Sequence, residues 1–333
     1  QDYTVEGFSA VTWKNTAPMY VGGVGFQPDL VWSKSRLNVQ GHSIGDAVTG
    51  FDRYGQTNGT AAYYSGLTSI APTADGFTSN ADWHTAGQTY VAWNWDMGGS
   101  NATNTDGSIT STVRASTTYG QSIVTYTGTG SAATVGHGLD SAPNMIMLKC
   151  ISEAGGDWKV QHTSLTDGDK VLYLNASVDE QDESDKFGAF AGATTFPLNG
   201  SHASVNGSSK TYVAYCFHSV TGYSSFGSYT GNATASGAEV TTGFKPAFLM
   251  IKRTDSSGEH WKIYDSVRDT INKRIWYLHA NETDAEAESA THNIDFDDTG
   301  FQPRGAGAGI NASGGTYIYM AFADNREYAY WLD

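Results

Sequence analysis

Basic residues are scarce in this chain of 333 residues, which has 19 Lys and Arg against 34 Asp and Glu. The difference, 34 − 19, gives a formal net charge of −15. Proteins bind nucleic acids and anionic membrane surfaces largely through Lys and Arg, so this charge excludes both as partners. Long apolar runs are also missing. No segment approaches the roughly 18 to 20 consecutive apolar residues of a membrane span, and we expect no membrane insertion.

Cysteine is nearly absent from the sequence. Cys150 and Cys216 are the two residues present, which rules out a disulfide scaffold and leaves two alternatives, one disulfide bridge or two buried free thiols. Neither belongs to a CxxC motif, and the nine histidines form no metal-binding pair such as HExxH. Phosphate-binding loops and nucleophile elbows are missing as well. We therefore expect no catalytic residue, no metal and no cofactor, and interpret the chain as non-enzymatic.

Acidic residues gather in two runs, at 179–185 and 295–298. Their spacing matches neither an EF-hand loop nor the paired carboxylates that glycoside hydrolases of the β-sandwich class place on one strand. We interpret both runs as solvated loops. A structural calcium ion held by their carboxylates is the alternative.

Glycine and aromatic residues are abundant, whereas charged residues make up only 16% of the chain. The 39 glycines follow no three-residue period, which excludes collagen. Short aromatic and β-branched segments such as 90–95 and 246–251 are bounded by Gly, Pro or Asn, which is typical of strands joined by tight turns. The sequence therefore predicts an all-β protein, with residues 283–291 as the best candidate for a short helix.

Three sequence patterns recur three times in the same order. The first is a glycine followed by a proline-led apolar segment that ends in lysine, at 25–34, 138–149 and 243–252. The last is a Thr-Tyr segment, at 89–93, 211–215 and 316–320. Between them lies a third pattern, at 42–46, 157–162 and 260–265. Such a period indicates repeated structural units.

We predict three tandem β-sandwich units of the jelly-roll or concanavalin-like kind, because a repeat of about 100 residues matches a common domain size. The first unit spans residues 1–99, the second 119–220 and the third 221–333, the last with a strand-like C-terminal tail. The polar, turn-rich segment 100–118 is the predicted linker.

Asparagine occurs unusually often in the N-x-S/T pattern that accepts N-linked glycans. Eight such sites occur, about twice the number that chance would produce at this composition. Either some carry sugar on an extracellular protein, or asparagine turns in a Ser/Thr-rich chain inflate the number. The candidate glycosylation sites are Asn58, Asn101, Asn175, Asn199, Asn206, Asn232, Asn281 and Asn311.

Strand-like, aromatic segments stand at both ends of the sequence, at 1–6 and 327–333. Repeated β units expose sheet edges, and a terminal strand that pairs with a neighbour's edge produces head-to-tail assembly. The alternative is that both ends extend the chain's own sheets. The candidate assembly residues are Tyr3, Val5, Tyr328, Tyr330 and Trp331.

Several sequence segments resemble a family of uncharacterised repeat domains in structural proteins of marine tailed phages, including those of cyanobacteria. The matching segments are 25–32 (GFQPDLVW), 106–113 (DGSITSTV), 126–130 (YTGTG), 133–139 (ATVGHGL) and 314–323 (GGTYIYMAFA). The resemblance extends from about residue 8 to residue 324. It implies a β-structural role in a virion or outside the cell, in a tail fibre or surface appendage, and it brings no catalytic residue with it.

We therefore expect a non-enzymatic structural subunit of an extracellular fibre or virion appendage, whose partner is a second copy of itself in a homo-oligomer or filament. The alternative is a carbohydrate-binding adhesion module on a phage or cell surface. For that alternative, Trp83, Tyr63 and Tyr64 are the aromatic residues that could stack on sugar rings, unless they pack under a loop. Either function predicts an extracellular or virion-surface location.

Overall fold

The computed structural model describes residues 7–16, 18–66, 70–81 and 83–324 of the chain. These residues form short antiparallel strands and a single one-turn helix, α1 (Ala308–Asn311), so the all-β class is confirmed. The candidate assembly residues Tyr3, Val5, Tyr328, Tyr330 and Trp331 lie outside the described residues.

The first unit consists of the strands between residues 8 and 95. They are β1 (Phe8–Lys14), β2 (Met19–Gly22), β3 (Leu30–Ser35), β4 (Ser43–Asp46), β5 (Arg53–Tyr54), β6 (Tyr64–Ser65), β7 (Ile70–Thr73), β8 (Gly76–Ser79) and β9 (Thr89–Trp95). The large sheet has the strand order β1-β9-β3-β4 and the small sheet the order β2-β8-β7, while β5 and β6 form a hairpin.

The second unit consists of the strands between residues 102 and 217. They are β10 (Ala102–Asn104), β11 (Ser111–Ser116), β12 (Gln121–Thr127), β13 (Ala133–Gly136), β14 (Met145–Cys150), β15 (Lys159–His162), β16 (Lys170–Tyr173), β17 (Gln181–Asp182), β18 (Thr195–Leu198) and β19 (Thr211–Phe217). The large sheet has the order β10-β11-β12-β19-β14-β15-β16-β17, and β13 pairs with β18.

The third unit consists of the strands between residues 224 and 322. They are β20 (Ser224–Thr230), β21 (Val240–Thr241), β22 (Phe248–Arg253), β23 (Lys262–Asp265), β24 (Trp276–His279), β25 (Ala287–Glu288), β26 (Ile294–Asp297), β27 (Gly300–Pro303) and β28 (Thr316–Phe322). The large sheet has the order β20-β28-β22-β23-β24-β25 and the small sheet the order β21-β27-β26.

The recurring sequence patterns occupy matching places in the three large sheets. The proline-led segments form β3, β14 and β22, and the Thr-Tyr segments form β9, β19 and β28. In each sheet the Thr-Tyr strand lies between the proline-led strand and β1, β12 or β20. A small sheet covers one face of each large sheet, and Phe77, Phe196 and Phe301 are buried between the two layers.

Two expectations about secondary structure are wrong. The predicted linker 100–118 contains β10 and β11, which extend the second large sheet, because Ser111 and Val113 are buried on one face while Thr112 is exposed. The predicted helix 283–291 is an irregular loop that ends in β25. There the Glu286 N–H donates to the carbonyl of Arg36 in the first unit, so a tertiary contact overrides local helix propensity.

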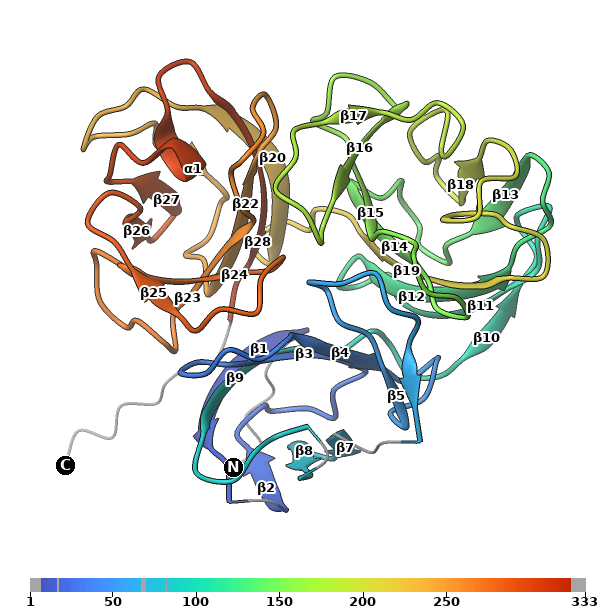
Figure 1. The fold of residues 1–333 in the computed structure, drawn as a ribbon, viewed down its shortest axis with the longest axis horizontal. Coiled ribbons are helices and arrows are strands. Elements are labelled where there is room, and N and C mark those ends of the chain that lie inside the picture. The colour runs from blue at the N-terminus through green and yellow to red at the C-terminus, as the bar shows by residue number, and fades with distance from the viewer. Residues whose placement is uncertain (1–6, 17, 67–69, 82, 325–333) are drawn as a thin grey trace.

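The uncovered faces of the three large sheets pack against one another and form a central hydrophobic core. Figure 1 shows the three units arranged around this centre, with each large sheet turned toward it. The core joins residues of all three units, including Trp95, Phe217 and Phe322, each at most 1% exposed. The Phe322 ring lies 5.4 Å from Phe8, 5.7 Å from Trp95 and 5.7 Å from Phe217, measured between ring centroids.

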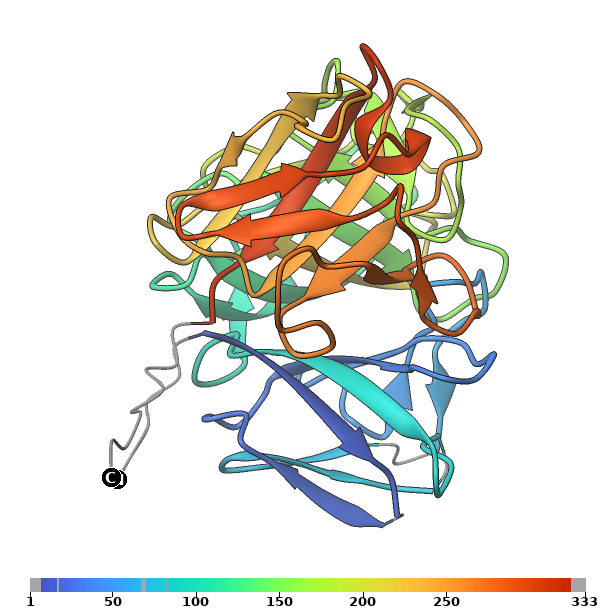
Figure 2. The same cartoon turned by 90° about the vertical axis from the view of Figure 1, so that its left-hand side faces the viewer.

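The start of β1 and the end of β28 lie side by side, since the rings of Phe8 and Phe322 stack at 5.4 Å. Figure 2 shows β28 crossing the third unit toward the first unit, where β1 begins. The described chain therefore enters and leaves the central core at the same place.

Replacing Phe322 with alanine should lower the free energy of unfolding by about 3–5 kcal/mol, because it removes a fully buried ring shared by the three sheets. Thermal or urea unfolding should remain a single transition, because the units share one core. Leu37→Ala is the control. Leu37 is 62% exposed, and its loss should change stability by at most about 0.5 kcal/mol. Separate transitions for separate units would contradict the shared core.

Candidate functional site

The three units contact one another in a closed ring through three equivalent seams. At each seam, the hairpin β5-β6, β16-β17 or β24-β25 of one unit contacts the next unit just after its proline-led strand. All three seams share two main-chain hydrogen bonds and one bond from a ring N–H to a main-chain carbonyl, beside bonds that differ from seam to seam. The first unit contacts the third, the second contacts the first, and the third contacts the second, so the ring closes.

The same three bonds recur with similar lengths. The first unit forms these bonds with the third. Arg36 O accepts from Glu286 N (2.7 Å) and Gln40 N donates to Thr283 O (2.8 Å). His42 Nε2 donates to His279 O (2.9 Å). On the second, Ile151 O accepts from Tyr63 N (3.1 Å), Gly155 N donates to Thr60 O (2.8 Å) and Trp158 Nε1 donates to Gln56 O (2.9 Å). On the third, Thr254 O accepts from Glu180 N (2.9 Å), Gly258 N donates to Ser177 O (2.8 Å) and Trp261 Nε1 donates to Tyr173 O (2.9 Å).

Three candidate glycosylation sites hold the ring donors of the seams in place. The side-chain oxygens of Asn58, Asn175 and Asn281 accept the main-chain N–H groups of His42, Trp158 and Trp261, at 2.7, 2.8 and 3.0 Å. Each asparagine thus fixes the backbone at the residue whose ring bonds the neighbouring unit.

Burial separates the other glycosylation candidates. Asn206 and Asn311 are fully buried and, like Asn281, donate their amide hydrogens to groups inside the protein. A glycan on any of these three asparagines would have to be accommodated where the folded protein buries the amide. Asn101, Asn199 and Asn232 are exposed, and for them glycosylation stays a prediction.

A buried lysine ends the proline-led segment of every unit. Lys34, Lys149 and Lys252 are each at most 1% exposed. Burial lowers the pKa of all three to about 8, because the surroundings solvate the ammonium group less well than water. Main-chain carbonyls bind the ammonium groups. Lys149 Nζ donates across a seam to Thr60 O at 3.2 Å, and Lys252 Nζ donates to Arg253 O at 2.6 Å.

Several polar side chains join two units inside the central core, and two of these contacts involve a buried carboxylate. Tyr215 of the second unit donates its hydroxyl to Asp46 of the first at 2.8 Å. Trp93 of the first unit donates its indole N–H to Asp265 of the third at 3.0 Å, and Arg268 also binds this carboxylate, at 2.6 Å. Burial raises the pKa of Asp46. These pairs satisfy buried charges and fix the rotation of one sheet against another.

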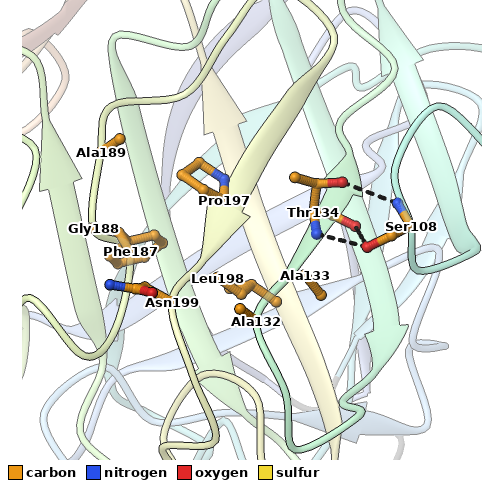
Figure 3. A pocket seen from close by; sticks show the side chains of 10 residues that line it. All are labelled: Ser108, Ala132, Ala133, Thr134, Phe187, Gly188, Ala189, Pro197, Leu198 and Asn199. Carbon is orange, nitrogen blue, oxygen red and sulfur yellow. Dashed lines mark hydrogen bonds between the residues drawn. The ribbon is translucent and has the colours of Figure 1, made fainter.

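Two cavities lie on the second unit. The larger, of about 570 Å³, lies over β13 and β18 (Figure 3). Its polar groups are largely paired, since Ser108 and Thr134 bond each other at 2.9 Å. Its lining residues are Ser108, Ala132, Ala133, Thr134, Phe187, Gly188, Ala189, Pro197, Leu198 and Asn199.

The smaller cavity, of about 210 Å³, lies between Cys150, Lys159 and the loop around His202. Lys159 Nζ is 3.0 Å from Glu183 and 3.7 Å from Asp157, and it lies over the Tyr173 ring. The lysine charge is therefore balanced within the wall. Such an arrangement stabilises the wall, and it places no free charge toward a ligand.

The two cysteines are free thiols, so of the two alternatives the disulfide bridge is wrong. In the strand pairing, Cys216 lies opposite Ile146, whereas Cys150 lies opposite Tyr212. Four residues along a strand separate the two thiols by about 13 Å, and a disulfide needs Cα atoms within about 7 Å. Burial raises the pKa of Cys216, which keeps it protonated.

The acidic runs bind cations supplied by the chain itself. Asp182 lies 3.1 Å from Lys170, Asp185 lies 2.8 Å from Lys186, and Asp295 lies 2.8 Å from Arg304. Among the described residues, no group of three His, Cys, Asp or Glu side chains is arranged to hold a metal ion. The alternative of a structural calcium ion has no site in this part of the chain.

The three aromatic candidates for sugar contact behave differently. Tyr63 is buried, and its hydroxyl bonds that of Tyr215 at 2.9 Å. Tyr64 is 40% exposed and stacks on Tyr54 with ring centroids 5.1 Å apart. Trp83 packs against the same Tyr54 ring at 4.8 Å. Tyr64 and Trp83 therefore both pack on the buried ring of Tyr54, and Tyr63 belongs to the core.

The match to known families spans all three units and their seams. The family model of a domain of unknown function, DUF7483, matches residues 6–326. The chain belongs to the DUF7483 family. A single DUF7483 match thus covers the whole ring and all three seams. No curated protein and no solved structure matches the chain. Within the described part of this DUF7483 member, no helix is long and apolar enough to span a membrane.

Replacing Asn281 with alanine should cost about 1–3 kcal/mol of unfolding free energy, because it leaves the buried N–H of Trp261 without an acceptor. Asn101→Ala, which removes an exposed glycosylation site, should change stability by at most about 0.5 kcal/mol. Urea unfolding of both variants measures the difference. Equal losses would contradict a structural role for Asn281.

Mild acid should destabilise the protein through its buried histidines. Burial lowers the pKa of six histidines below the usual 6.5. The pKa falls to about 4, 3 and 4 for His162, His279 and His292, and it lies well below 6.5 for His42. Below pH 6.5 the unfolded chain therefore binds protons that the folded state does not bind, so stability falls as pH falls.

Burial also raises the pKa of two carboxyl groups, that of Asp29 to about 6 and that of Asp46 in the same direction. These two groups act in the opposite direction but are fewer than the histidines. The free energy of unfolding should thus drop by at least about 2 kcal/mol between pH 7 and pH 5. Urea titrations at both values measure it. His162→Gln should make the pH dependence weaker, and an unchanged dependence would show that His162 does not contribute.

Proposed function

We propose that the protein is a non-enzymatic structural module of an extracellular fibre or virion appendage. The observation that carries this proposal is the closed ring of three seams around one core. In such a ring every unit is bonded to both others, so no hinge between units is left to bend. A body of this kind suits a part that bears load or displays a surface.

The use of polar side chains supports the same function. Buried histidines, lysines, asparagines and aspartates of the described chain bond across seams or within walls. Enzymes instead converge such groups on a cleft with pKa values tuned to the reaction. The exposed asparagines Asn101, Asn199 and Asn232 are the sites at which an extracellular form would carry glycans.

A second function, carbohydrate-binding adhesion, is favoured by the aromatic surface of the first unit. Tyr64 is 40% exposed and stacks on Tyr54, whose ring also contacts Trp83. The flat apolar face of a pyranose ring can pack on such a ring. Loss of glycan-array binding in Tyr64→Ala but not in the exposed control Tyr20→Ala would support adhesion.

Electron microscopy of the purified full chain tests the structural function. We expect filaments or regular oligomers, because the partner of a fibre subunit is a second copy of itself. A variant lacking residues 1–6 tests whether this terminal segment is donated to a neighbouring copy, and it should assemble less. Monomers at every concentration together with binding of a defined sugar would reject the fibre and favour adhesion.

A further inference from the structure

One long edge of the third large sheet has no strand beside it among the described residues. The edge is β20, seven residues long, which pairs only with β28. The main-chain bonds Gly231 N to Gly315 O and Ala323 N to Tyr223 O show that the odd-numbered residues of β20 face β28. The even-numbered residues therefore direct their N–H and C=O groups away from the sheet.

The chain itself satisfies only the first half of this edge. Ser224 N donates to Val220 O at 2.9 Å, and Phe226 N donates to the Ser219 hydroxyl at 3.1 Å. The main-chain groups of Ser228 and Thr230 bond no described residue, and both residues are exposed. The unpaired part of the edge is thus the stretch around these two residues.

The second unit shows how the same edge can be occupied. Thr125 of β12 lies opposite Val213 of β19, just as Ser228 lies opposite Ile318 of β28. On its other side Thr125 pairs with Thr112 of β11. A strand therefore fits beside this position, and the third unit lacks its counterpart to β11.

Charge indicates which partner fits. The protein has a net charge of −15, so two copies repel each other over most of their surface. From Ser219 to Ala238, however, the sequence contains no Asp, Glu, Lys or Arg. An uncharged segment is where two copies of an acidic chain can approach at the lowest electrostatic cost.

Other described edges have features that discourage pairing. Strands β17, β21 and β25 contain two residues each, β7 and β18 contain a proline, and β26 contains two aspartates. Natural proteins protect edges in these ways. Strand β1 is as long as β20 and pairs only with β9, but it ends in the exposed Lys14, whose charge discourages pairing. Strand β20 contains no proline and no charged residue.

We propose that β20 pairs with β20 of a second copy, antiparallel about a twofold axis, and joins two third-unit sheets into one. The proposal rests on the proposed structural function and names one contact of its assembly. The paired residues are Ser228 and Thr230, whose outward N–H and C=O groups would form the new ladder. The contact is isologous, so by itself it yields dimers that further contacts would link into a fibre.

Thr230→Pro tests this contact, because it removes an N–H that points away from β28 and keeps the bonds within the sheet. Analytical ultracentrifugation from about 1 to 100 µM should show wild type shifting from 35.6 kDa toward twice that mass. Thr230→Pro should weaken the dimer about tenfold or more. Thr230→Val keeps the N–H and should dimerise like wild type.

A crosslink provides a second readout that does not depend on the folding of the proline variant. Ser228→Cys should form a disulfide-linked dimer on mild oxidation. Cys150 and Cys216 are at most 2% exposed, so a crosslink would come from residue 228. Thr112→Cys, at an exposed position of β11, is the control and should stay monomeric.

Three outcomes would overturn the proposal. A wild-type mass of 35.6 kDa at all concentrations, or no Ser228→Cys crosslink despite dimer formation, would exclude the β20 contact. If the dimer disappears when residues 1–6 are removed but persists in Thr230→Pro, the contact belongs to a donated terminal segment. Filaments seen by microscopy in any of these cases would leave the structural function standing, so the two proposals fail separately.

Discussion

The nine hydrogen bonds that recur at the three seams are the constraint on which the rest of the structure depends. They orient the three large sheets so that their uncovered faces meet, and only then can Trp95, Phe217 and Phe322 share one core. Two-thirds of these bonds join main-chain atoms. Side-chain changes at the seams can therefore be tolerated more easily than changes in backbone course, provided that the asparagines behind the ring donors remain.

Much of the fold follows from local sequence. Glycine and proline before short apolar segments predicted the strands correctly, because turn chemistry and period-two burial act within a few residues. The weak pattern around His42 proved equivalent to those around Trp158 and Trp261, since all three rings donate across a seam. The seams themselves could not be predicted. Their partners lie far apart in the sequence, and main-chain acceptors such as Gln56 O leave no residue signature.

Long-range contacts also explain why some predictions from the sequence differ from the structure. Two asparagines of N-x-S/T patterns, Asn175 and Asn281, accept main-chain hydrogen bonds at equivalent places in two units, a role that the pattern itself does not reveal. The acidic, alanine-containing segment 283–291 favours a helix locally, yet the bond from Glu286 to Arg36 holds it in a loop. The polar segment 100–118 hides a strand because only one face of β11 is buried.

The meeting of Phe8 with Phe322 has a consequence for the order of the units. Since each unit contacts both others and the chain returns to its starting point, no unit is geometrically first. A circularly permuted chain that began with the third unit and ended with the second, with a short connection near residues 7 and 324, would retain every seam. The contacts thus specify a cyclic order of the three units, and they are compatible with a chain that begins at any one of the units.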